Sequence, residues 1–100
     1  MQVLVTPEAA ELLESRKRWW RENRPVTADL FDGEFSGAVG LIAERPALFP
    51  VTLRIGEREV RRVLMEKTAC HLYYEIDEAR GIVKIVSAWG AVRGKPPRIE

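Results

Sequence analysis

The sequence predicts an α+β fold in which an N-terminal strand precedes an antiparallel pair of helices and a mainly antiparallel sheet. Apolar residues recur at steps of three or four between residues 9 and 42, which is helical spacing. From Val51 onwards they alternate with polar residues, which is typical of strands. Because the helices precede most of the strands, we expect them to form a hairpin on one face of the sheet. The other face would then be open for function.

Length and composition indicate one soluble domain covering residues 1–100. Apolar residues make up 46% of the chain and charged residues 31%, which excludes the composition of a disordered protein. The net charge of +1 hides an asymmetry, since residues 51–100 hold 10 Lys and Arg against 7 Asp and Glu. This basic excess could attract an anionic partner, although typical nucleic-acid-binding domains are far more basic.

The first half of the chain contains a strand and a helix with clear boundaries. Residues 2–5 are short, apolar and β-branched, which favours a strand. Thr6-Pro7-Glu8 is a typical helix start, with a hydroxyl cap, a proline in the first turn and an acid near the positive end of the helix dipole. The residue before a proline avoids helical backbone angles, so Arg24-Pro25 is expected to end this helix.

The second helix is expected to begin at a Thr27 cap, with Asp29 in its first turn. Its apolar stripe consists of Leu30, Phe31, Phe35, Ala38, Leu41 and Ile42. Three glycines also fall within it, namely Gly33, Gly37 and Gly40. Each glycine lowers the intrinsic stability of the helix by up to ~1 kcal/mol. We expect them to permit close approach to the first helix or to the sheet.

Four further strands are predicted at residues 51–55, 58–66, 71–77 and 82–89. Gly56-Glu57 fits a two-residue hairpin turn that has glycine in the first position. The last strand is almost continuously apolar, so we expect it to lie inside the sheet and to be covered on much of both faces.

The single cysteine, Cys70, cannot form an internal disulfide and is interpreted as a buried apolar residue at a strand start. Its neighbour His71 would point to the opposite face of the strand and is interpreted as a surface or hydrogen-bonded residue.

The chain shows neither a leader peptide nor an apolar run near the ~20 residues of a membrane helix, which predicts a cytoplasmic protein without a membrane partner. No metal or cofactor is expected, because the sequence has no metal-binding cluster and no phosphate-binding glycine loop.

Short motifs follow one another in order along nearly the whole chain. They are Thr6-Pro7-Glu8-Ala9, Trp19-Trp20, Arg24-Pro25, Phe31 to Phe35, Ala38 to Leu41, Pro46, Val60-Arg61-Arg62, Leu72-Tyr73-Tyr74, Ala88-Trp89, Arg93-Gly94 and Pro97. In order and spacing, this series resembles the ParE/RelE superfamily, the toxins of bacterial type II toxin–antitoxin systems. The resemblance implies a compact toxin of the RelE/ParE fold.

The resemblance also implies a partner and a target. A cognate antitoxin of the ParD or RelB kind would wrap the toxin, and any contact with DNA would come through the antitoxin. ParE-like members poison DNA gyrase and arrest growth without hydrolysis, whereas RelE-like members enter the ribosome and cleave mRNA. ParE-like activity is favoured here, because Gly90 stands where relatives often have histidine and only Lys67 and Lys84 fall near the sheet. Whether the chain is an enzyme therefore stays open, and a module that only sequesters an antitoxin is a third alternative.

The resemblance supplies candidate catalytic residues for the RelE-like alternative. Arg61 matches the strand arginine, Tyr74 the family's tyrosine position and Arg93 the C-terminal arginine. Cleavage at the 2′-hydroxyl needs a base, an acid and cations that stabilise the transition state. Arginine and tyrosine replace histidine in some relatives.

The residues expected to bind the target or the antitoxin are Arg61, Arg62, Trp89, Arg93, Lys95 and Arg98. Arg61 and Arg62 are neighbours in a strand and must point to opposite faces, so at most one of them lies on the open face. We expect the other to form a salt bridge at the edge of the sheet. The adjacent tyrosines Tyr73 and Tyr74 alternate in the same way, so one of them belongs to the core. Trp19-Trp20 is interpreted as part of the helix packing.

Overall fold

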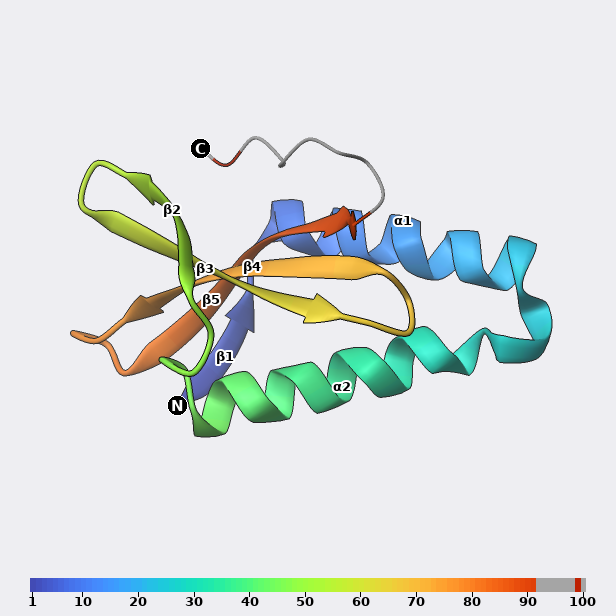
Figure 1. Cartoon of the computed structure of the whole chain (residues 1–100), viewed down its shortest axis with the longest axis horizontal. Coiled ribbons are helices and arrows are strands. Elements are labelled where there is room, and N and C mark those ends of the chain that lie inside the picture. Colours follow the sequence, from blue (N-terminus) through green and yellow to red (C-terminus); the bar gives the residue numbers. More distant parts are fainter. Residues whose placement is uncertain (92–98, 100) are drawn as a thin grey trace.

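The computed structural model describes residues 1–91 and Ile99. Its elements are β1 (Gln2–Val5), α1 (Pro7–Asn23), the 3-10 helix η1 (Pro25–Thr27), α2 (Asp29–Glu44), β2 (Val51–Ile55), β3 (Arg58–Met65), β4 (Cys70–Asp77) and β5 (Ile82–Gly90). Figure 1 shows two helices joined at one end of the molecule and a twisted sheet at the other. The α+β class predicted from the sequence is confirmed.

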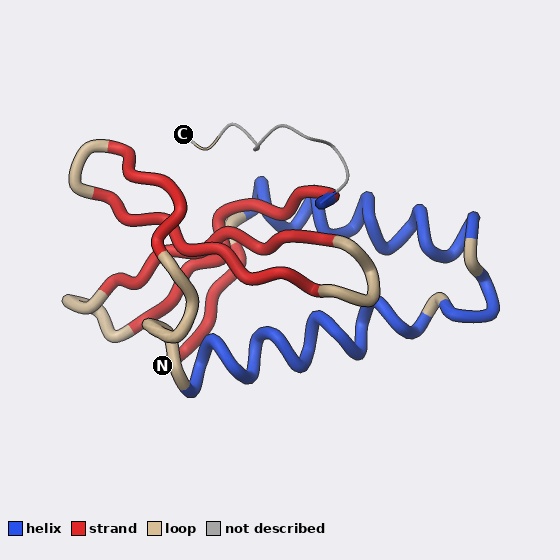
Figure 2. Tube along the Cα trace, in the orientation of Figure 1, coloured by secondary structure: helices blue, strands red, loops and turns tan. Residues whose placement is uncertain are grey.

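The five strands form one mixed sheet in the order β1-β5-β4-β3-β2 (Figure 2). β1 runs parallel to β5, and the other neighbouring strands are antiparallel. The tight turn between β2 and β3 has Ile55 opposite Arg58, and Gly56 has a φ of 60°, as the two-residue hairpin prediction requires. β5 lies between β1 and β4, in agreement with the interior position predicted for the last strand.

Both helices pack on the same face of the sheet. The buried core consists of Ala9, Leu13, Phe31, Ala38 and Ile42 from the helices and Val63, Met65, Cys70, Leu72, Tyr74, Val83, Ile85 and Ala88 from the strands. Cys70 is fully buried, and this burial raises the pKa of its thiol, as expected for a structural cysteine. Val60 and Tyr73 are also buried, but they lie outside this core.

The boundaries of α1 are as predicted, and the start of α2 is not. The backbone N–H of Ala9 donates to Thr6 Oγ1 at 3.2 Å, and α1 ends just before Arg24-Pro25. Thr27 lies in η1, where its hydroxyl donates to the carbonyl of Arg24 at 3.4 Å. The predicted Thr27 cap is therefore wrong, because the 3-10 turn directs this hydroxyl back to the end of α1.

The glycines of α2 do not serve close packing within the chain. A Cβ atom added at Gly33, Gly37 or Gly40 would meet nothing within 4 Å, so the expected approach to α1 or to the sheet is wrong. The core side of α2 is set by Phe31 and Ile42, and the glycines fall outside it.

Candidate functional site

The neighbouring arginines Arg61 and Arg62 of β3 lie on opposite faces of the sheet. Arg61 stands opposite Tyr74 of β4, and Arg62 stands opposite Tyr73. Because directly opposed side chains share a face and Tyr74 belongs to the core, Arg61 is on the helix side and Arg62 is on the open face. The expectation that only one of the two reaches the open face is confirmed.

Arg61 holds the loop between α2 and β2. One nitrogen of its guanidinium, Nη1, donates to the carbonyl oxygens of Ala47 at 3.2 Å and Phe49 at 2.6 Å. The expected salt bridge is wrong for Arg61 in the described part of the chain, because backbone carbonyls rather than a carboxylate take its hydrogen bonds.

Tyr74 holds the same loop from the adjacent strand. Its ring is fully buried, and its hydroxyl donates to the carbonyl of Pro46 at 2.6 Å. Burial raises the pKa of Tyr74, and the charge of Arg61 offsets part of that rise. The structure thus brings two members of the suggested catalytic set together, but on the covered side of the sheet and engaged with the loop. Arg93, Lys95 and Arg98 lie outside the described residues.

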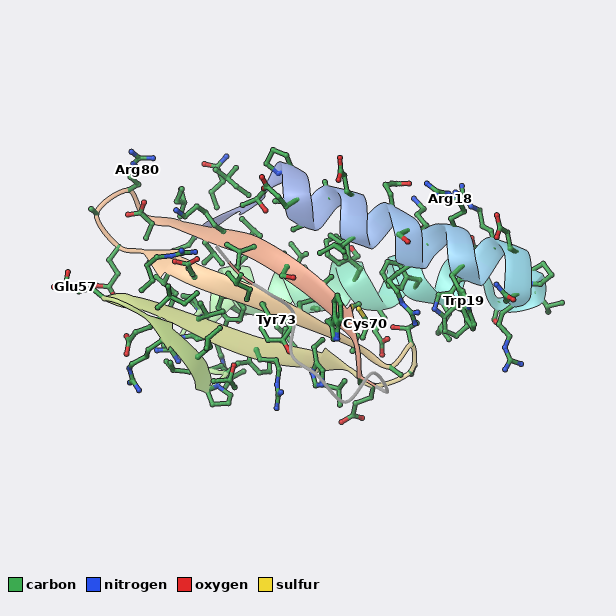
Figure 3. The ribbon with its side chains drawn as sticks, turned by 90° about the horizontal axis from the view of Figure 1, so that it is seen from above. Arg18, Trp19, Glu57, Cys70, Tyr73 and Arg80 are labelled. Atoms are coloured by element: carbon green, nitrogen blue, oxygen red, sulfur yellow. The ribbon has the colours of Figure 1, made fainter. Side chains whose placement is uncertain are left out.

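A different group of side chains meets on the open face. His71 stands opposite both Leu64 and Trp89, and Tyr73 stands opposite both Arg62 and Ser87. We refer to Arg62, Leu64, His71, Tyr73 and Trp89 as the open-face cluster. The rings of His71 and Tyr73 meet edge to face with centroids 6.2 Å apart. Tyr73 is marked in Figure 3, and the cluster spans β3, β4 and β5.

His71 is the titratable centre of this cluster. Its partial burial, and secondly the charge of Arg62, lower the pKa of its imidazole. Its Nδ1 atom is buried and has no hydrogen-bond partner within the described structure. Burial and Arg62 therefore both favour the neutral form of this ring. Sequence reasoning gave His71 no role, although strand alternation could have placed it on the face that Arg62 occupies.

The opposite end of the sheet is not a cationic surface, although the excess of Lys and Arg in residues 51–100 suggested one. Arg58 binds Glu75 through two hydrogen bonds of 2.9 and 2.5 Å, and Arg54 binds Glu59 at 3.0 Å. A groove of about 460 Å³ at this end is lined by Glu57, Arg58, Glu59, Arg61, Glu75, Ile76, Asp77, Glu78 and Lys84. Its carboxylates outnumber its cations, so a large polyanion is not favoured there. Figure 3 shows this end, marked by Glu57 and Arg80.

Within residues 1–91 and Ile99, no three His, Cys, Asp or Glu side chains are arranged to hold a metal ion. Neither helix in this part of the chain has the length and apolar character needed to cross a bilayer. No model of a protein family matches the chain, and no curated protein matches it.

Proposed function

We propose that the chain is a cytoplasmic, ParE-like toxin that arrests growth by poisoning DNA gyrase and that a cognate ParD- or RelB-like antitoxin neutralises. The motif series along the chain and the α+β arrangement of helix pair and sheet support the toxin assignment. In this proposal the toxin acts through protein contacts, without a metal or a cofactor, and touches DNA only through its antitoxin.

We favour a protein target because most arginines of β2 and β3 are already bound within the chain. A surface that binds RNA needs free cations to neutralise phosphates. On β2 and β3, however, Arg54, Arg58 and Arg61 are all engaged within the chain. Arg62 is exposed, and no ion pair or hydrogen bond to its side chain is formed within residues 1–91 and Ile99. One exposed arginine beside the exposed Leu64 and the half-buried rings of His71 and Trp89 is typical of a protein–protein interface.

The test is a gyrase cleavage assay with supercoiled DNA, ATP and the purified chain. We expect linear DNA to accumulate after protease treatment, and we expect Arg62→Glu to abolish this product. Arg54→Glu is the matched control, because Arg54 is an exposed arginine bound to Glu59 and remote from the open-face cluster. Unchanged DNA at a large excess of the chain would reject gyrase as the target.

A RelE-like activity is the second candidate, and His71 is the observation that favours it. A neutral imidazole beside Arg62 supplies a base for the 2′-hydroxyl and a cation for the phosphate charge that develops in the transition state. These two residues would replace Arg61 and Tyr74 in the catalytic set. Primer extension on translated mRNA should then show codon-specific cuts that disappear in His71→Asn, whereas intact mRNA on programmed ribosomes would reject this activity.

The third alternative, a module that only sequesters an antitoxin, differs from both toxins in the cell. Expression of the chain without its antitoxin should stop growth if it is a toxin. Normal growth with full accumulation of folded protein would favour the sequestering module.

A further inference from the structure

The last three residues of β3, Val63–Met65, have a free edge. β2 pairs with β3 only as far as Arg61, and the last bond between the two segments runs from the N–H of Arg62 to the carbonyl of Pro50 at 3.3 Å. Val63–Met65 pair with β4 on one side, and no strand of the described chain lies on the other. Backbone groups alternate along a strand, so the N–H and C=O of Leu64 point to the same side as the N–H of Arg62. Leu64 therefore offers a donor and an acceptor at an open edge.

An apolar flank of α2 lies beside this edge. A groove of about 280 Å³ is lined by Glu34, Ala38, Leu41, Phe49, Val63, Leu64, Met65, Glu66 and Lys67. Leu41 and Leu64 at its rim are 46% and 44% exposed. Gly37 is one turn before Leu41 and Gly33 one turn before that, so all three share one side of α2. The space at both glycines is empty to 4 Å, which leaves room for another element to approach.

We infer that this edge and flank pair with the same surface of a second copy of the chain, in a two-fold symmetric dimer. Antiparallel pairing centred on Leu64 sets the Leu64 residues opposite each other with two mutual backbone hydrogen bonds. The same register sets Val63 opposite the second copy's Met65, and it brings the side chain of Arg62 towards the second copy's Glu66 just beyond the ends of the paired segment. Each pair occurs twice by symmetry, so the surface complements itself both in charge and in apolar contact.

The helices fit the same two-fold axis. Antiparallel contact of the two α2 helices centred on Gly37 sets Leu41 over the second copy's Gly33, so that a large side chain meets an empty space. Both contacts lie along the same stretch of the molecule, because Glu34 binds the N–H groups of Lys67 and Thr68, Leu41 shares the groove with Leu64, and Gly37 lies between Glu34 and Leu41 along α2. Glycine at the centre removes the side chain that would otherwise hold the two helices apart.

The dimer would be short-lived, because the free edge is only a few residues long. It would close by itself, because a two-fold contact uses the same surface of both copies and leaves none of that surface for a third copy. It covers the Arg62 and Leu64 side of the open-face cluster. Self-association at high concentration would therefore hide part of the surface that the proposed target requires, whichever target that is.

Sedimentation of the purified chain between ~1 and ~300 µM tests the pairing. We expect a reversible monomer–dimer equilibrium. Arg62→Glu and Glu66→Arg should each weaken dimerisation about tenfold, because each sets two like charges opposite each other. The double variant should restore the affinity of the unaltered chain to within about twofold. Residues 62 and 66 are too far apart within one strand to repair each other inside a single copy.

A second pair of variants separates dimerisation from folding. Gly37→Arg should raise the helical stability of the monomer while abolishing the dimer, because the new side chain has open space in one copy and collides only in two. Ser36→Arg is the matched control, since Ser36 is exposed and the helical rotation carries it to the other flank of α2. Dimerisation should survive in Ser36→Arg.

Two results would overturn the inference. One is a chain that stays monomeric at every concentration. This includes the case in which the backbone amide of Leu64 becomes protected from hydrogen exchange only when antitoxin is added. The other is a dimer whose stability is unchanged by Gly37→Arg and by both charge reversals, which would place the contact elsewhere.

Discussion

The two faces of the β3–β4 pair carry the same residue types but have different environments. On the helix side, Arg61 and Tyr74 are engaged with the loop that follows α2. On the open side, Arg62 is exposed beside Tyr73 and a half-buried His71. The comparison teaches that adjacent arginines in a strand can have different environments, because the face that each one occupies decides whether it is bound within the chain or exposed to solvent.

The largest expected effect is the removal of the Tyr74 ring. Tyr74→Ala should lower the free energy of unfolding by about 3–5 kcal/mol, because it leaves a cavity in the core. Tyr74→Phe removes only the hydrogen bond to Pro46 and should cost about 1 kcal/mol. Urea unfolding measures both changes, and a loss below about 1 kcal/mol in Tyr74→Ala would contradict a core position.

The two arginines should respond oppositely to truncation. Arg61→Ala should destabilise the fold by about 1–3 kcal/mol, because the carbonyl of Phe49 loses its donor, and should leave toxicity at permissive temperature. Arg62→Ala should change stability by less than about 0.5 kcal/mol and reduce activity on the target. Equal losses of stability in the two variants would remove the contrast between the faces. Growth and thermal unfolding of both variants supply the two measurements.

Glu34 supports the turn that joins β3 and β4. Its carboxylate accepts hydrogen bonds from the N–H of Lys67 at 2.8 Å and from the N–H and hydroxyl of Thr68 at 2.9 and 2.6 Å. Glu34→Gln should cost about 1–2 kcal/mol, since an amide offers only one acceptor oxygen to these donors.

The pH dependence of the Glu34 contact has a defined sign. Burial alone would raise the pKa of Glu34, but the hydrogen bonds from Thr68 and Lys67 outweigh it and hold the pKa below its ordinary range. The carboxylate therefore adds stability above the unfolded pKa and loses that contribution as pH falls through the folded pKa. Glu34→Gln should flatten the acid limb of a stability–pH curve, and an unchanged limb would exclude this contribution.

The smallest effect concerns the titration of His71. NMR titration should give an imidazole pKa below that of an exposed histidine, because burial and Arg62 both disfavour the charged ring. Arg62→Ala should raise this pKa part of the way, and Arg54→Ala should leave it unchanged. Stability due to neutral His71 is present above the unfolded pKa and is lost as pH falls through the folded pKa. A His71 pKa that does not respond to Arg62→Ala would separate the two residues.

The start of α1 and the turn between β2 and β3 could be predicted from the sequence, because they depend on local chemistry. The start of α1 at Thr6-Pro7 and the turn at Gly56 depend on backbone angles and bonds between near neighbours, which the sequence states directly. The start of α2 was missed because Thr27 lies in a 3-10 turn, where its hydroxyl donates to the carbonyl of Arg24 and α2 begins without a side-chain cap. The parallel pairing of β1 with β5 joins segments that are distant along the chain, so no local pattern predicted it.

The sequence by itself determined the class of fold, the order of the elements and the rule that Arg61 and Arg62 face opposite ways, because these follow from the period of a strand and the spacing of apolar residues. Only the tertiary structure decided which arginine is covered, because that depends on where the loop after α2 crosses the sheet and which carbonyls it presents. It also decided that the glycines of α2 face outwards and that Val63–Met65 of β3 pair with β4 only, since both depend on how distant segments share a limited surface.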